Sequence, residues 1–141
     1  MESKNKELLF RDICCRLQYG VKAYVRNYSK LDRKWYEGTY TIKSTYPDLN
    51  EILVTSEKFS VEVLVGYDDY EIKPYLIPLS SMTEVQKNIY SIYIDELKRN
   101  DGTYFETIFT SLQFWLYANH FDVNGLIPLG LAIDATDKKI Y

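Results

Sequence analysis

The stretch Leu79-Ser80-Ser81-Met82-Thr83-Glu84-Val85-Gln86 separates two halves of the sequence that have different hydrophobic periodicities. Before it, apolar and polar residues alternate with a period of two, which is typical of strands with one wet face. After it, apolar residues recur every three or four positions, which is typical of amphipathic helices. Strands followed by helices predict an α+β domain rather than a wound parallel sheet.

Four or five short strands are expected between Val21 and Leu79. The clearest alternation lies in residues 59–65, where Phe59 is followed by a valine at every second position. Pro74 and Pro78 should confine the last strand to an edge or a strand end, because proline cannot donate to a sheet ladder. Consecutive strands of this length form either an antiparallel meander or a small SH3-like barrel, and the pattern leaves both open.

Helices are expected on both sides of these strands. Glu7 to Leu17 reads as a short N-terminal helix that ends at Tyr19-Gly20, since glycine tolerates the positive φ found after many helices. In the second half, two capping boxes, Thr83 with Gln86 and Thr103 with Glu106, each predict a helix start.

The last helix, from Thr103 to about Asn119, is apolar around much of its circumference. We therefore expect it to be packed on two sides and to form the centre of the core, with both C-terminal helices lying on the sheet. A short strand through Leu131 and Ile133 should follow.

Composition indicates one folded domain spanning residues 1–141. It also limits the classes of partner that this domain is expected to bind. The hydrophobic share is 46% and the charged share 26%, both near the globular average. The net charge of −3 disfavours general binding to phosphate backbones, although a local basic patch stays possible. Neither a secretory signal nor a membrane span is visible, so we expect a protein of the cytoplasm that does not bind membranes.

The only histidine, His120, falls near the predicted end of the last helix. There an imidazole can bond to the last carbonyl groups and complement the helix dipole, so we expect a structural role for it. Asp122 is expected to cap the turn that follows.

Other residue types that catalyse reactions or hold metals are sparse. Cys14 and Cys15 lack the C-x-x-C spacing of redox and zinc sites, so we expect reduced thiols, one of them packed in the core. Asp68, Asp69 and Glu71 are read as a solvated turn, because adjacent carboxylates rarely surround a metal. We predict no catalytic residue, no metal site and no cofactor.

A cluster of basic and aromatic residues in the β region is the candidate binding face. Basic side chains beside aromatic ones can bind single-stranded nucleic acid through charge and stacking, whereas the alternative reading is an ordinary solvated sheet face. The candidate residues are Tyr24, Arg26, Tyr28, Arg33, Lys34, Trp35, Tyr36 and Lys43.

Three segments resemble a family of small uncharacterised proteins encoded by phages and prophages of Bacteroides-type gut bacteria. They are residues 12–22, residues 72–84 and the C-terminal His120-Phe121-Asp122 with residues 125–132, in the family's order. The chain departs from the family at Gln18, where proline is common, and at Ile77, where arginine is usual. The resemblance implies a phage or prophage context within a bacterial host cell and a one-domain boundary, and it carries over no catalytic residue.

These observations favour a non-enzymatic binding or accessory protein that acts through protein contacts or self-association. The missing motifs and the 14 tyrosines support this hypothesis, since tyrosine suits contact surfaces. The main alternative is a nucleic-acid-binding module that uses the basic and aromatic face. A weaker alternative is an enzyme with an unfamiliar carboxylate or thiol site.

Overall fold

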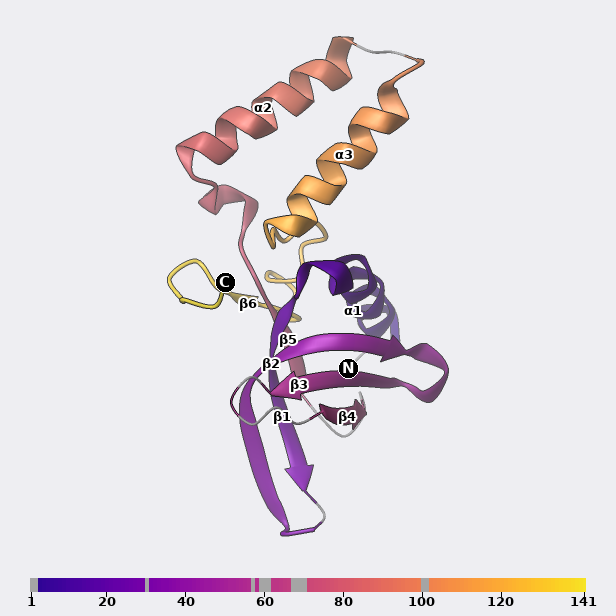
Figure 1. Cartoon of the computed structure of the whole chain (residues 1–141), viewed down its shortest axis with the longest axis vertical. Coiled ribbons are helices and arrows are strands. Elements are labelled where there is room, and N and C mark those ends of the chain that lie inside the picture. The colour runs from indigo at the N-terminus through magenta and orange to yellow at the C-terminus, as the bar shows by residue number, and fades with distance from the viewer. Residues whose placement is uncertain (1–2, 30, 57, 59–61, 67–70, 100–101) are drawn as a thin grey trace.

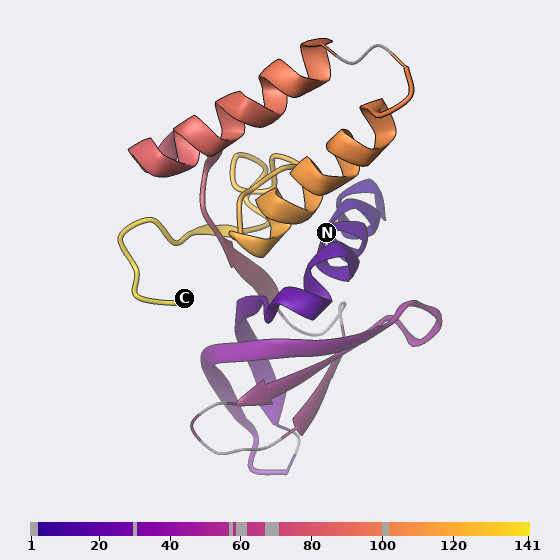
Figure 2. The same ribbon diagram turned by 45° about the horizontal axis from the view of Figure 1, so that its top comes forward.

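The computed structural model describes residues 3–29, 31–56, 58, 62–66, 71–99 and 102–141. It has an N-terminal helix, a curled six-stranded sheet and a pair of helices that projects from them (Figures 1 and 2), which confirms the predicted α+β fold. The helices and strands are α1 (Ser3–Arg16), β1 (Lys22–Ser29), β2 (Lys34–Tyr46), β3 (Glu51–Ser56), β4 (Glu62–Gly66), β5 (Glu71–Leu76), α2 (Glu84–Arg99), α3 (Phe105–Ala118) and β6 (Ile133–Asp134).

The sheet has the strand order β4-β3-β2-β1-β5-β6. Strands β1 to β5 pair in antiparallel fashion, as predicted, whereas β6 joins β5 in parallel and makes the sheet mixed. Among the described residues no strand pairing joins β4 to β6, so the sheet is curled and not closed by hydrogen bonds. Pro74 fits within β5 because β6 pairs only with Tyr75 and Leu76, which leaves that side of Pro74 without a β6 partner.

The main core lies between the sheet and α1. On β1, Ala23 and Val25 point inward and are buried, as their alternation predicts. Leu9 and Ile13 of α1 are fully buried against this face. Residues of the C-terminal segment complete the same cluster, namely Leu126, Leu131 and Ala132.

Helices α2 and α3 form an antiparallel hairpin, here called the arm, that stands away from the sheet (Figure 1). The expectation that both helices lie on the sheet, with the last helix at the centre of the core, is wrong. Helix α1 and the C-terminal segment already cover the inner face of the sheet, so an apolar stripe of α2 joins a separate cluster with Leu112 and Leu116 of α3 and with Met82 and Phe121. Consequently α2 contains no buried residue, and the arm has a small core of its own around Leu112 and Leu116.

Of the helix starts and ends predicted from the sequence, two are confirmed and one is wrong. Thr83 and Gln86 form the predicted capping box, with backbone-to-side-chain hydrogen bonds of 2.9 and 3.2 Å. The second predicted box is wrong, because α3 begins at Phe105 after Tyr104, which makes no side-chain cap hydrogen bond. Gly20 has a φ of 67° and ends the first helical segment, as predicted.

The division into a main core and an arm predicts unequal costs for two alanine substitutions. Leu9→Ala should lower the free energy of unfolding by about 2–5 kcal/mol, because it leaves a cavity in the core. Ile92→Ala, on the outside of α2, should change it by no more than about 0.5 kcal/mol in dilute solution. Urea denaturation of both variants measures the difference, and equal losses would contradict this assignment of the core.

Candidate functional site

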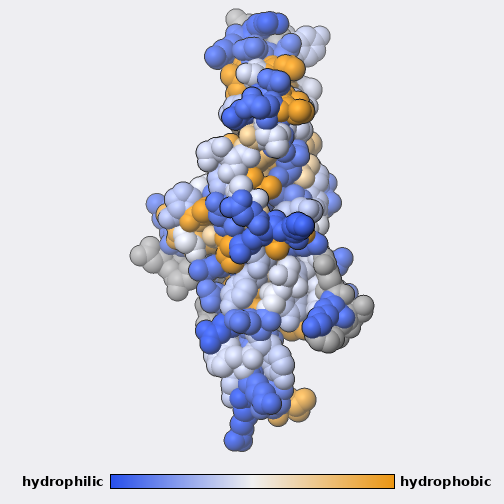
Figure 3. All heavy atoms as spheres, turned by 90° about the vertical axis from the view of Figure 1, so that its left-hand side faces the viewer, coloured by the Kyte–Doolittle hydropathy of each residue, from blue (hydrophilic) through white to orange (hydrophobic). Residues whose placement is uncertain are grey.

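Large apolar side chains are exposed along the arm. Val85 and Ile92 on α2 are 67% and 62% exposed, and Phe105 and Phe109 on α3 are each 43% exposed. Figure 3 shows hydrophobic residues in orange on this upper part of the molecule, between hydrophilic ones. Tyr104 and Phe114 are also exposed.

Two apolar stripes run along α2, and α3 covers only one of them. Tyr90, Tyr93 and Leu97 belong to the small core of the arm, and the Tyr93 ring lies 6.1 Å from that of Trp115. Val85, Ile89 and Ile92 follow one another at intervals of four and three residues, which places them on a second stripe of the helix. This second stripe, Val85–Ile89–Ile92, is called the outer stripe below.

On α3, a single stripe changes from exposed to buried along its length. Phe105 and Phe109 lie one turn apart near the tip of the arm, and their rings stack with centroids 6.2 Å apart. Leu112 and Leu116 continue the same helical spacing toward the base, where both are buried. On α3 the side chains of this stripe are thus exposed near the tip of the arm and buried near its base.

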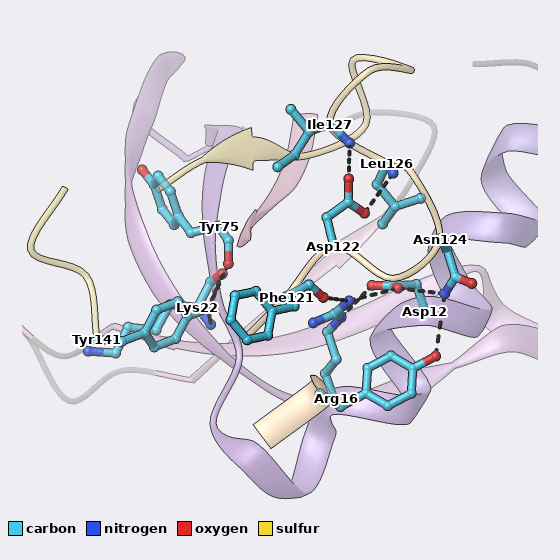
Figure 4. Close-up of polar contacts among 11 residues, drawn as sticks. Asp12, Arg16, Lys22, Tyr75, Phe121, Asp122, Asn124, Leu126, Ile127 and Tyr141 are labelled. Atoms are coloured by element: carbon cyan, nitrogen blue, oxygen red, sulfur yellow. Dashed lines mark hydrogen bonds and ion pairs between the residues drawn. The ribbon is translucent and has the colours of Figure 1, made fainter. Parts of the chain in front are cut away.

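The base of the arm is held by a fully buried arginine. Arg16 of α1 donates to both carboxylate oxygens of Asp12, at 2.6 Å from Nε and 3.1 Å from Nη2 (Figure 4). Its Nη2 also donates to the backbone carbonyl oxygen of Phe121 at 2.6 Å, just after α3. The guanidinium lies over the ring of Tyr117, 4.8 Å from its centroid. One side chain therefore connects α1, α3 and the segment after α3.

The same segment is fixed by two further acidic contacts. Asn124 donates to Asp12 Oδ1 at 2.8 Å, so the carboxylate of Asp12 has a partner besides Arg16. Asp122 accepts hydrogen bonds from the backbone N–H groups of Leu126 and Ile127 at 2.8 and 2.9 Å. The predicted role of Asp122 as a cap of the following turn is confirmed.

On the opposite side of this region, the side chain of the last residue, Tyr141, contacts both β1 and β5. The Tyr141 hydroxyl accepts from the backbone N–H of Lys22 at 3.0 Å and donates to the carbonyl of Tyr75 at 2.9 Å (Figure 4). Its ring stacks on the imidazole of His120, with centroids 3.4 Å apart.

His120 has a structural role, but not the one predicted from its position. Burial, together with the positive charges of Arg16 and Lys22, lowers its pKa from 6.5 to about 4. A neutral imidazole contributes no charge to the helix dipole at neutral pH, so that part of the prediction is wrong. His120 also adopts a φ of 62°, which turns the chain from α3 toward Phe121.

The predicted candidate binding face is divided between the two faces of the sheet. Residues directly opposite on paired strands share a face, which places Tyr24, Arg26, Tyr28 and Trp35 together. Arg26 lies over the Trp35 ring at 4.6 Å, and the Tyr28 ring is 5.3 Å from the same indole.

The other four predicted residues do not join this group. Lys34 and Tyr36 pair with Ser29 and Asn27, on the side of the sheet that carries Ala23 and Val25. Arg33 lies in the turn before β2, and the sheet register shifts at Lys43 between Ile42 and Ser44. The structure thus brings together half of the predicted face.

Acidic residues lie beside the four residues that do come together. Glu37 is directly opposite Arg26 on β2, and Glu71 is opposite it on β5. The Tyr24 hydroxyl donates to Glu37 at 2.7 Å, and Glu71 pairs with Lys73 at 3.2 Å. Around Arg26 the surface is therefore mixed in charge.

Both cysteines are exposed free thiols, so the expectation that one packs in the core is wrong. Helix α1 presents Leu9 and Ile13 to the core, whereas Cys14 and Cys15 lie outside it, with the Cys14 thiol 3.3 Å from the Thr45 hydroxyl of β2. They border a pocket of about 310 Å³ between α1 and α3, together with Phe114.

The part of the chain that the structure describes contains no group of three or more His, Cys, Asp or Glu residues that could hold a metal ion. Asp68 and Asp69 of the predicted acidic turn lie outside the described residues. None of the described helices has the length and apolar character needed to cross a membrane.

Sequence reasoning missed the buried Asp12–Arg16 pair. The signal for it is the spacing of an acid and a base four residues apart on a helix, which predicts contact but not burial. Comparison with known protein families, with curated proteins and with solved structures finds no match for this chain.

The lowered pKa of His120 predicts a specific dependence of stability on pH. Above pH 6.5 the imidazole is neutral in the folded and unfolded chains. Below that value the unfolded chain takes up a proton that the folded chain accepts only near pH 4, so stability is lost as the pH falls.

The melting temperature of the wild type should therefore fall more steeply between pH 6.5 and about 4 than that of His120→Asn. Asparagine suits the positive φ at this position, and His120 is the only histidine, so the carboxylates contribute similarly in both proteins. Parallel melting curves across this range would contradict the lowered pKa.

Proposed function

We propose that this protein is a non-enzymatic binding or accessory protein that acts through protein contacts made by the arm. The observation that carries the proposal is the exposure of large apolar side chains on both helices of the arm, such as Ile92 and Phe109. Large apolar side chains gathered in this way, such as the stacked rings of Phe105 and Phe109, are typical of interaction sites. Covering it with a partner removes apolar area from water, which is the main favourable contribution to association.

The shape of the arm supports the same function. Both helices carry large exposed apolar side chains, and α2 has no buried residue at all, whereas α3 also contacts α1 near the base of the arm. The base is fixed to the body through Arg16 and Phe121, so the arm presents its apolar surface in a defined direction. A preorganised surface loses less conformational entropy on binding than a flexible segment does.

The nucleic-acid alternative has less support. It requires a basic face, whereas Arg26 lies on the Trp35 ring and is flanked by Glu37 and Glu71. Lys34 lies on the other side of the sheet. The overall charge of −3 adds no attraction for phosphate.

A cellular context is part of the proposal. The resemblance to proteins of phages and prophages supports an accessory role in the cytoplasm of a bacterial host cell. A partner would then be a host or phage protein with a complementary apolar surface, or another copy of this chain.

Site-specific photo-crosslinking tests the proposal. A photoreactive phenylalanine analogue at Ile92 or Phe109 should form discrete adducts with protein, because a partner covers these positions. The same analogue at Thr39, an exposed residue of β2, serves as the matched control and should form none. Mass spectrometry identifies the attached chain.

Val85→Asp in the same chain should abolish the adduct at Ile92, because a buried carboxylate destabilises an apolar interface. Adducts that survive this change, or that form equally from Thr39, would contradict the proposal. Binding to single-stranded nucleic acid that weakens with salt and disappears in a Lys34→Glu, Lys43→Glu variant would instead support the nucleic-acid alternative.

A further inference from the structure

We propose that a pocket on the inner side of the sheet binds a small organic cation, one that carries a guanidinium or ammonium group. The pocket has a volume of about 370 Å³, which is within the range of small-molecule sites. It is separate from the arm, so this inference goes beyond the proposed function and does not depend on it. The described residues that line the pocket are Asn27, Ser29, Asp32, Tyr36, Tyr40, Ser56 and Val63.

The pocket forms where the inward-facing residues of the sheet change from apolar to polar. On β1, the buried Val25 is followed on the same face by Asn27 and Ser29. On β3, the buried Val54 is followed in the same way by Ser56. The pocket extends to the turn between β1 and β2, which lies at the end of the molecule opposite the arm (Figure 1). The inner side of the sheet thus continues past the main core as a polar hollow.

Asp32 gives the pocket a negative charge. Its carboxylate accepts hydrogen bonds from the Tyr36 hydroxyl and, at 3.3 Å, from the backbone N–H of Lys34. Hydrogen bonds from Tyr36, Ser29 and Lys34 lower the pKa of the Asp32 carboxyl, so it is ionised at neutral pH. Each carboxylate oxygen has a further lone pair that can accept from a ligand.

Asn27 carries the observation that points most directly to a ligand. Its side-chain Oδ1 is buried and has no hydrogen-bond partner among the described residues. A buried acceptor without a partner is costly, and native proteins satisfy nearly all such groups. The terminal torsion of an asparagine side chain is broad, so the amide can turn its oxygen toward a donor in the pocket. A ligand with N–H groups would therefore remove this cost.

The other lining residues fit the same class of ligand. Tyr36 and Tyr40 bring two aromatic rings to the pocket, and a cation lies favourably against the face of a tyrosine ring. The described lining residues include no lysine or arginine, and Arg33 and Lys34 of the neighbouring turn are exposed to solvent. An anionic ligand would meet the charge of Asp32 without a cation to offset it, whereas a guanidinium or ammonium group would pair with it.

Isothermal titration calorimetry with two guanidinium probes tests the inference. Agmatine represents a free organic cation, and a blocked glycine–arginine–glycine peptide represents an arginine side chain of a partner protein. At least one of them should bind with a Kd below about 1 mM, and the tighter of the two identifies the source of the cation. Glutarate, a dianion of similar length, should not bind. Absence of binding by both guanidinium probes at about 10 mM would overturn the inference.

Asp32→Asn removes the charge and keeps an oxygen that can accept from the N–H of Lys34. It should weaken agmatine binding at least about tenfold, the effect of losing one charge-assisted hydrogen bond. Glu37→Gln is the matched control, because it removes the same charge from β2 on the opposite face of the sheet, where Glu37 lies across from Arg26. Its affinity should stay within about twofold of the wild type. Equal weakening in both variants would show general attraction to an acidic chain and would overturn the inference.

Asn27→Leu keeps the approximate size of the side chain and removes the unpartnered oxygen. It should weaken agmatine binding at least about tenfold. The melting temperature of the ligand-free variant should equal or exceed that of the wild type, since a buried polar group without a partner is replaced by an apolar one. Agmatine should raise the melting temperature of the wild type more than that of this variant. A lower melting temperature with unchanged affinity would show that Asn27 is structural only and would overturn the inference.

Discussion

The position of every element at the base of the arm depends on the burial of the Arg16 guanidinium. A buried charge is costly unless it is paired and hydrogen-bonded, so the chain must bring partners to it. Asp12 supplies a carboxylate one turn earlier on α1, and Phe121 supplies a carbonyl oxygen from the segment after α3. Residues 105 positions apart in the sequence are joined by this contact. A pair of this kind contributes little net stability but strongly restricts where its partners can lie.

This constraint explains why the molecule has a main core and a separate arm. Helix α1 and the C-terminal segment cover the inner face of the sheet. Arg16 holds the segment after α3 beside α1. The rest of α3 then has no place on the sheet, and it carries α2 with it away from the body (Figure 2). The apolar residues that remain exposed, including Ile92 and Phe109, are therefore a consequence of the architecture and available to a partner.

Much of the fold could be predicted because it depends on local patterns. Alternation identified the buried residues of β1, and the side chains of Thr83 and Gln86 identified the start of α2. Hydrophobic periodicity indicates which residues are buried, but it does not indicate which elements pack against them. For this reason the last helix as a whole is predicted at the centre of the core, although Phe105 and Phe109 share a stripe with the buried Leu112 and lie exposed near the tip. The residues of the predicted binding face are divided between the two sides of the sheet for a similar reason, since residues close in sequence alternate between the two faces of a strand.

The most direct test of this account is a double-mutant cycle on Asp12 and Arg16, followed by chemical denaturation. Asp12→Leu and Arg16→Met should each destabilise the protein by about 3–5 kcal/mol, because each leaves a buried charge without its partner. The double variant should lose much less than the sum, since no uncompensated charge remains, and the coupling should exceed about 1 kcal/mol. Losses that add within about 0.5 kcal/mol would show that the pair does not organise the base of the arm.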